Sequence, residues 1–187
     1  MRSAIFALLL ALPLMQGCVL VAGTAAATGV VISQDRRTIG TITEDEGIEI
    51  KASGRISEKF KEDVHVNLTS FNRMVLLTGE VPDAAARTEV ERIVWAVENV
   101  RGVYNELAIA GASSFTVRSN DSVITTKVKA RFLDSQKFNA LHVKVITENS
   151  VVYLMGLVTK EEADIATEIA RTTSGVQKVV RLFEYIG

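Results

Sequence analysis

The sequence predicts an α+β fold made of two tandem copies of one αββαβ unit, each a three-stranded mixed sheet packed on two helices. Two segments that alternate apolar and polar residues, 64–69 and 141–146, begin 77 positions apart. The segments that follow them, 74–81 and 151–158, are again 77 positions apart. A repeat at a fixed offset indicates that one structural unit occurs twice, and alternation with a period of two is typical of half-buried strands.

Each unit is expected to open with an amphipathic helix. Ahead of each first strand, apolar residues recur at every fourth position, as they do on the buried face of a helix. These residues are Ile48, Ala52, Ile56 and Phe60 in the first copy and Ile124, Val128 and Phe132 in the second. The Asn-Asp-Ser sequence at residues 120–122 supplies side-chain oxygens that we expect to cap the start of the second of these helices.

The remaining elements follow from turn residues and apolar spacing. The turns Phe71-Asn72-Arg73 and Glu148-Asn149-Ser150 are expected to close two hairpins. The second helices are expected over residues 84–98 and 160–173, and the closing strands over residues 103–109 and 179–186.

Gly79 and Gly156 occupy equivalent positions inside hairpin strands. A glycine inside a strand usually marks a bulge or a close approach of another backbone, and the partner expected here is a helix that crosses the sheet. Asn99 and Gly175 end the second helices, and both residue types tolerate the left-handed conformation of a helix C-cap. We therefore interpret these four residues as structural.

The amino-terminal residues have the layout of a secretory signal peptide. Arg2 precedes an apolar run over residues 4–14, and Gly17 stands directly before Cys18. The run is shorter than the roughly 20 residues that a helix needs to span a bilayer. We therefore expect cleavage of residues 1–17, and a lipidated N-terminus and tether over residues 18–44.

Cys18 is the expected site of lipidation. It is the only cysteine of the chain, so no intramolecular disulfide can form. The Met-Gln-Gly-Cys sequence at residues 15–18 resembles the bacterial lipobox, in which a diacylglycerol is attached to the thiol before cleavage. Residue 19 is Val instead of the Asp that favours retention in the inner membrane, so the resemblance implies the outer membrane. Several acyl chains, at roughly 0.8 kcal/mol per buried methylene, attach a protein essentially irreversibly.

The repeat itself resembles the BON domain. Both copies carry a Leu-x-Gly-x-Val strand, at residues 77–81 and 154–158, and a Gly-Val pair precedes each last strand. Two such copies behind a lipobox make the whole chain similar to the dual-BON outer-membrane lipoproteins, with BON domain 1 at 45–111 and BON domain 2 at 119–187. The resemblance is stronger in the second copy than in the first.

The resemblance implies a location and a ligand that composition and periodicity do not show. Such a protein is lipid-anchored in the outer membrane and faces the periplasm, where it supports envelope integrity and collects at the cell-division site. It binds anionic phospholipids, such as phosphatidylglycerol and cardiolipin, through the first helix of its second BON domain. The family carries an aromatic residue at the start of this helix, where Val123 stands in this chain.

The helix that follows Asn120 has a composition suited to that ligand. Its face opposite the core stripe pairs apolar residues with cations, as expected for contact with anionic headgroups. The predicted lipid-binding residues are Val123, Thr126, Lys127, Lys129, Ala130, Arg131 and Leu133. Residues 119–140 hold two acidic and four basic side chains, a net charge of +2, whereas residues 45–63 hold six acidic and four basic ones, a net charge of −2. Only the second helix is expected to be attracted to an anionic surface.

Other classes of function are not supported by the sequence. The net charge of −1 argues against a general nucleic-acid binder. No catalytic constellation, cofactor motif or metal-ligand spacing is found, and His65 and His142 are expected to be equivalent residues of the repeat instead of one metal site. The main alternative is a periplasmic adaptor that recruits envelope-assembly, division or cell-wall remodelling proteins without binding lipid; a soluble periplasmic protein with two BON domains is a third reading.

Overall fold

The computed structural model describes residues 35–61 and 63–187. The predicted signal peptide, Cys18 and the tether up to residue 34 lie outside these ranges. Residues Arg36–Gly187 form one compact unit, which contains both copies of the repeat. Among the described residues, no helix is long and apolar enough to cross a membrane.

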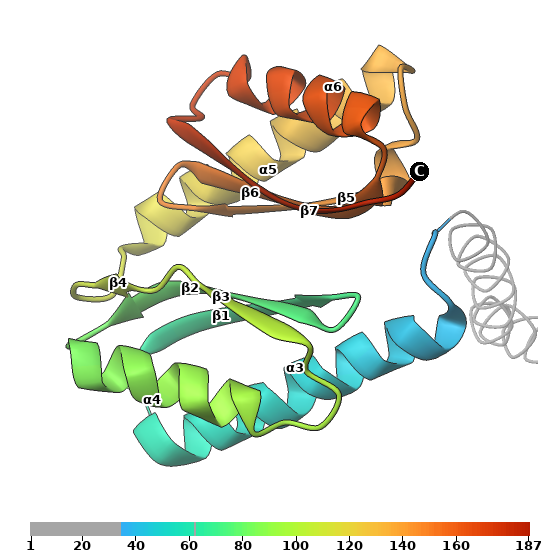
Figure 1. The fold of residues 1–187 in the computed structure, drawn as a ribbon. Helices are drawn as coiled ribbons and strands as arrows, with labels where there is room; N and C mark the ends of the chain where they lie inside the picture. Colours follow the sequence, from blue (N-terminus) through green and yellow to red (C-terminus); the bar gives the residue numbers. More distant parts are fainter. Residues whose placement is uncertain (1–34, 62) are drawn as a thin grey trace, which may run out of the picture. The chain divides into compact units, whose positions relative to one another are not determined.

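The first domain contains two helices on one face of a sheet (Figure 1). Its elements are α3 (Ile39–Phe60), β1 (His65–Phe71), β2 (Met74–Val81), α4 (Ala84–Trp95), β3 (Gly102–Asn105) and β4 (Ala108–Ile109). Strand β2 runs antiparallel to β1 and parallel to β3 and β4. The closing strand expected as one piece is split, because the Asn105 side chain accepts the Leu107 N–H and Leu107 turns into the core. This sheet therefore has four strands instead of three.

The second domain repeats this order (Figure 1). Its elements are α5 (Phe115–Ser135), the 3-10 turn η2 (Ala140–His142), β5 (Val143–Glu148), β6 (Val151–Val158), α6 (Lys160–Arg171) and β7 (Lys178–Tyr185). Strand β6 is central, antiparallel to β5 and parallel to β7. The α+β prediction of two αββαβ units is confirmed.

Both first helices begin earlier than the sequence indicated. Helix α3 starts at Ile39, within the segment expected to be a tether, and the Thr38 hydroxyl caps it by accepting the Thr41 N–H at 3.1 Å. Helix α5 starts at Phe115 and is capped by Ser114. The expectation that residues 120–122 cap this helix is wrong, because they lie inside it.

Three apolar cores hold the compact unit together. One core in each domain lies between the helices and the sheet, around Val90 in the first domain and Val128 in the second. A third core joins side chains of both sheets, and its buried members are Phe71, Leu76, Tyr153 and Met155. Because this core draws on β2 and β6 together, the sheet surfaces that the helices leave uncovered are buried against each other.

A buried aspartate on the first helix of each domain holds the hairpin turn. Asp121 accepts the backbone N–H groups of Asn149 and Ser150 at 2.9 and 2.8 Å. Both turn residues have positive φ, 48° and 63°, as in the type I′ turns that suit two-residue hairpins. Asp45 binds the equivalent turn of the first domain in the same way, at 2.8 and 2.7 Å. Asp121, which was expected to cap the helix, therefore fixes the helix to the sheet instead.

Gly79 and Gly156 make room for the backbone next to them in the hairpin. The expectation that a helix crossing the sheet approaches these glycines is wrong. A Cβ atom on Gly79 would overlap the carbonyl oxygen of His65, and one on Gly156 would overlap the carbonyl oxygen of His142. Each glycine pairs with the first strand of its own hairpin. Gly79 also has a φ of 110°, which a residue with a side chain rarely adopts.

Replacing Asp121 with alanine should destabilise the unit by about 2–4 kcal/mol, because two backbone N–H groups lose a charged acceptor in a buried place. Urea denaturation of the variant measures this loss. Asp134→Ala, on the exposed side of the same helix, should change stability by less than about 0.5 kcal/mol. Equal effects of the two substitutions would contradict the role assigned to Asp121.

Candidate functional site: the exposed face of helix α5

Helix α5 is divided sharply between a buried and an exposed face. Ile124, Val128 and Phe132 are fully buried in the core of the second domain. On the opposite face Val123 is 50% exposed and Leu133 is 64% exposed. Thr126, Lys127, Lys129 and Ala130 are also exposed. The structure therefore places six of the seven predicted lipid-binding residues on the solvent side of one helix.

Arg131 is the seventh, and its side chain is engaged elsewhere. Its guanidinium donates to the carbonyl oxygen of Ile169 at 2.8 Å and to the hydroxyls of Thr172 and Thr173 at 3.1 and 2.7 Å. These acceptors lie in and just after the last turn of α6 (Lys160–Arg171), where a cation satisfies free carbonyl groups and opposes the helix dipole. Arg131 therefore joins α5 to α6.

Phe115 is an exposed residue of this helix that was not among the predicted lipid-binding residues. It opens α5 and is 78% exposed. It precedes Leu133 by 18 residues, which is five helical turns, so the two side chains lie on one face about 27 Å apart. An aromatic residue thus stands at the start of the helix, eight positions before Val123. The Ser113-Ser114 pair before Phe115, which offers capping hydroxyls, was the signal for this earlier start.

The lysines of this face differ from the basic residues of α3 (Ile39–Phe60). In the ranges that the structure describes, Lys127 and Lys129 form no ion pair. By contrast, Lys59 lies 2.9 Å from Glu89, and Arg55 donates to the Ala96 carbonyl at 2.8 Å. The cations of α5 are therefore available to an external anion, whereas those of α3 are largely used within the first domain.

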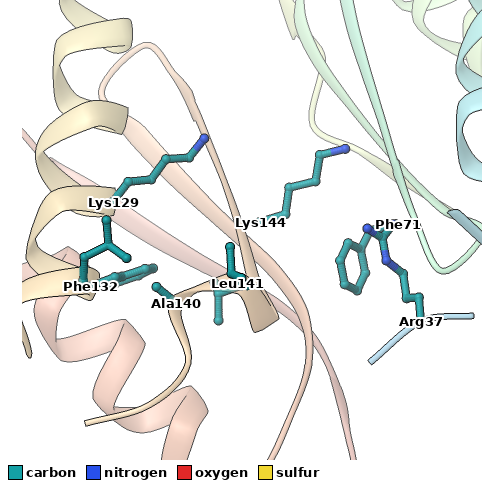
Figure 2. A pocket seen from close by; sticks show the side chains of 9 residues that line it. Arg37, Phe71, Lys129, Phe132, Ala140, Leu141 and Lys144 are labelled. Carbon is teal, nitrogen blue, oxygen red and sulfur yellow. The ribbon is translucent and has the colours of Figure 1, made fainter. Parts of the chain in front are cut away.

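A pocket of about 310 Å³ adjoins the C-terminal part of this face (Figure 2). It has apolar walls with cations at the margin. Its lining comes from Arg37, Phe71, Lys129, Phe132, Leu133, Ala140, Leu141, Val143 and Lys144. Lys144 also contacts Glu49, and Arg37 lies 4.0 Å from the centre of the Phe71 ring. Of the three cations, Lys129 alone makes no such contact among the described residues.

Two consecutive arginines bind different domains. Arg37 donates to Asp45 at 2.8 Å and covers the ring of Phe71, both in the first domain. Arg36 donates to both carboxylate oxygens of Glu162 at 2.6 and 3.0 Å, in the second domain. The segment expected to be a tether therefore contributes, at its end, to holding the two domains together.

Glu162 is the anionic centre of the contact with Arg36. Burial alone would raise the pKa of its carboxyl, but hydrogen bonds from Arg36, the Thr159 N–H and His142 lower the pKa from 4.5 to about 2. Glu162 also forms a capping box with Thr159 at the start of α6. It stays ionised over the range in which proteins are normally studied.

No metal site was expected from the sequence, because its His, Cys and carboxylate residues show no ligand spacing. The tertiary structure nevertheless brings His65, Glu80 and Glu148 together, with ligand atoms within 4.8 Å of one another. These residues come from strands of both domains. His142 is not among them and contacts Glu162 instead, at 3.3 Å.

Comparison with known proteins places this geometry in a family. The BON domain model matches residues 45–111 and 120–187. The chain is 38% identical to the outer membrane lipoprotein DolP of Haemophilus influenzae over 92% of this chain and 90% of that protein. It is 34% identical to a 21 kDa hemolysin of Actinobacillus pleuropneumoniae, over 81% and 79% of the two chains. It is 26% identical to the osmotically-inducible protein Y of Escherichia coli, over 83% and 80%.

Replacing Glu162 with glutamine should remove a stabilisation that depends on pH. A carboxyl whose pKa falls on folding stabilises the folded state above its ordinary pKa of 4.5, and the effect is lost as the pH falls towards 2. Melting temperatures of the two proteins should therefore differ most above pH 4.5 and converge in acid. The exposed neighbour serves as control, because Glu161→Gln should leave no such trend. A gap that stays constant at all pH values would count against the Arg36–Glu162 contact.

Proposed function

This chain belongs to the DolP family of dual-BON outer-membrane lipoproteins, and from that premise we propose that it binds anionic phospholipid through helix α5 (Phe115–Ser135) of its second domain. By this contact it supports the integrity of the outer membrane, at the site of cell division. Phosphatidylglycerol and cardiolipin are the lipids proposed. The proposed role is binding, not catalysis.

One observation carries the proposal: a single helix face combines exposed apolar side chains with lysines that the described residues leave unpaired. Phe115, Val123 and Leu133 supply apolar surface, and Lys127 and Lys129 supply the charge. An interfacial helix binds by burying such a face at the level of the headgroups, with cations directed at anionic lipid. Each basic residue near the surface contributes about 1 kcal/mol.

Cys18 is the proposed anchor, with the chain facing the periplasm. Acyl chains on this residue hold the protein on the membrane without help from α5. The contribution of α5 is therefore selectivity: it distinguishes anionic from zwitterionic lipid and so decides where on the membrane the anchored protein gathers.

The alternative function is that of an adaptor for envelope-assembly, division or cell-wall remodelling proteins, and one observation favours it. Ile50 is 74% exposed on α3, one helical turn after the exposed side chain of Glu46. An exposed apolar residue beside an acidic one suits a protein partner better than an anionic membrane. The lipid experiment separates the two functions, because an adaptor would ignore vesicle composition.

The first test uses residues 36–187, a compact unit that contains all three cores. This unit should co-sediment with vesicles that contain phosphatidylglycerol and not with vesicles of phosphatidylcholine alone. The double variant Lys127→Gln, Lys129→Gln should bind up to about thirtyfold more weakly, since two contributions of about 1 kcal/mol are lost. Leu133→Ser should also weaken binding.

A matched control loses the same charge elsewhere in the second domain. Lys160 and Lys178 are both exposed and lie outside α5, so Lys160→Gln, Lys178→Gln should reduce binding much less. If both double variants bind equally, or if the unchanged unit ignores phosphatidylglycerol, the proposal fails.

The second test concerns the anchor. In cells given a radiolabelled fatty acid, such as palmitate, the chain should take up label and fractionate with the outer membrane. Cys18→Ala should abolish the labelling and release the protein from that fraction. Labelling that persists in the variant would exclude Cys18 as the acylated residue.

A further inference from the structure

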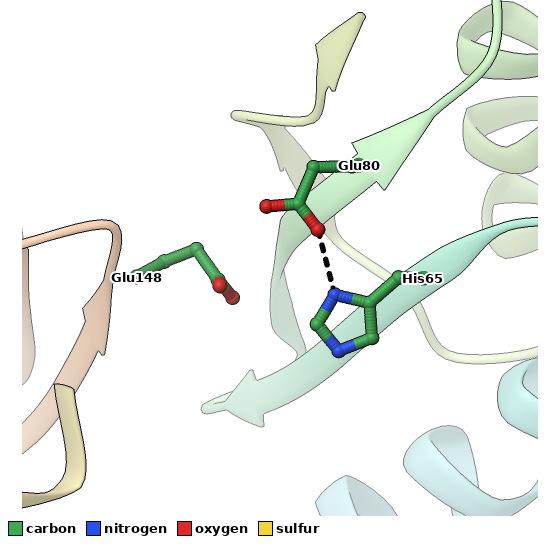
Figure 3. A group of neighbouring side chains, drawn as sticks. All are labelled: His65, Glu80 and Glu148. Atoms are coloured by element: carbon green, nitrogen blue, oxygen red, sulfur yellow. Dashed lines mark hydrogen bonds and ion pairs between the residues drawn. The ribbon is translucent and has the colours of Figure 1, made fainter. Parts of the chain in front are cut away.

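A histidine and two buried carboxylates meet where the two domains join (Figure 3). His65 lies on β1, Glu80 on β2 and Glu148 on β5. The His65 Nδ1 atom is 2.8 Å from a Glu80 oxygen, and the ligand atoms of all three residues lie within 4.8 Å of one another. In Figure 3 the carboxylate of Glu148, on β5 of the second domain, points towards the side chains of His65 and Glu80.

The cluster has more negative charge than the protein neutralises. Glu80 and Glu148 are only 3% and 7% exposed. Throughout the described ranges no lysine or arginine forms an ion pair with either carboxylate. Hydrogen bonds from Asn149, at 2.9 Å, and from Asn67, at 2.8 Å, help to hold the two carboxylates in place. Amide donors of this kind orient a carboxylate but carry no net positive charge, so two buried anions share one histidine.

The equivalent histidine of the second domain shows the difference that a cation makes. His142 also contacts a glutamate, Glu162, but there Arg36 binds both carboxylate oxygens. At His65 the second group is another carboxylate instead of a guanidinium. The two domains therefore use the equivalent histidine position differently. At His142 an arginine neutralises the neighbouring glutamate, whereas at His65 no lysine or arginine of the described residues neutralises the two glutamates.

The surroundings also contain a buried hydroxyl without a hydrogen-bond partner in the described residues. Ser113 donates its backbone N–H to Glu80 at 3.1 Å, while its own buried hydroxyl has no hydrogen-bond partner in the described residues. A pocket of about 390 Å³ reaches the cluster, and His65, Asn67, Arg118 and Glu148 are among its lining residues. This pocket gives an ion a way in and gives a water molecule room to complete its coordination. Arg118 is exposed and forms no ion pair with Glu148.

We propose that His65, Glu80 and Glu148 bind a divalent transition-metal ion, with Zn²⁺ as the best fit. One imidazole nitrogen and two carboxylates, with a water as fourth ligand, are a ligand set that Zn²⁺ accepts, whereas Mg²⁺ and Ca²⁺ prefer oxygen ligands alone. Tetrahedral Zn²⁺ with bonds of about 2.0–2.2 Å separates its ligand atoms by about 3.3–3.6 Å. That spacing falls between the 2.8 Å contact of His65 with Glu80 and the 4.8 Å limit of the cluster.

The bound ion would act as a cross-link between the domains. Two ligands come from the first domain and one from the second, so coordination ties the β1–β2 hairpin to the end of β5. A ligand that binds only the folded, joined arrangement raises its apparent stability. This inference does not depend on lipid binding, because α5 contributes no ligand.

Isothermal titration of the metal-free unit 36–187 with Zn²⁺ alone tests the site. The unit contains no cysteine, so no thiol competes for the ion. One Zn²⁺ should bind per chain and raise the melting temperature, and an excess of Mg²⁺ should not displace it. His65→Gln and Glu148→Gln should each weaken binding at least tenfold, because each removes a ligand, and loss of a mere supporting group already costs about 10- to 100-fold.

The control variant is His142→Gln, which removes the equivalent histidine of the repeat and should leave Zn²⁺ affinity unchanged. Circular dichroism and the melting temperature without metal show whether each variant is folded. If the His65 variant does not fold, the Glu148 variant provides the test. The absence of stoichiometric binding to the unchanged unit overturns the proposal. So does an equal loss of affinity in the His65 and His142 variants.

Discussion

The arrangement of each domain depends on one buried aspartate that ties the first helix to the hairpin. Asp45 and Asp121 each accept two backbone N–H groups from a tight turn whose residues have positive φ. Backbone groups buried without a partner are costly, so the turn keeps its form only while the helix stays beside it. The carboxylate therefore fixes the rotation of the helix as well as its position.

Fixed rotation decides which face of α5 meets the solvent. With Asp121 held on the sheet, the stripe of Ile124, Val128 and Phe132 must enter the core. The remaining face is then the one that carries Leu133 and the unpaired lysines. Arg131 strengthens the same constraint from the other side, because it binds the end of α6. A rigid helix presents a preorganised surface, which lowers the entropy that the proposed membrane contact would cost.

The two domains are joined by polar contacts around an apolar centre. Phe71 and Tyr153 belong to the core that both sheets share. At its margin Asn72 donates to Glu184 at 2.8 Å, and Asn149 donates to Glu80 at 2.9 Å. The hairpin turns that the aspartates shape therefore also supply the contacts between domains. The aspartate-bound hairpin turn therefore stabilises each domain and also contributes contacts between the two domains.

Periodicity along the chain was enough to predict the repeat, the succession of helices and strands in each unit and the core stripe of α5. It also placed Lys127, Lys129 and Leu133 on one exposed face, since helical spacing is a local property. It could not reveal that Asp121 holds a hairpin turn or that Arg131 binds the end of α6. Only the tertiary structure brought His65, Glu80 and Glu148 together, because contacts between residues far apart in the chain depend on how the two domains pack.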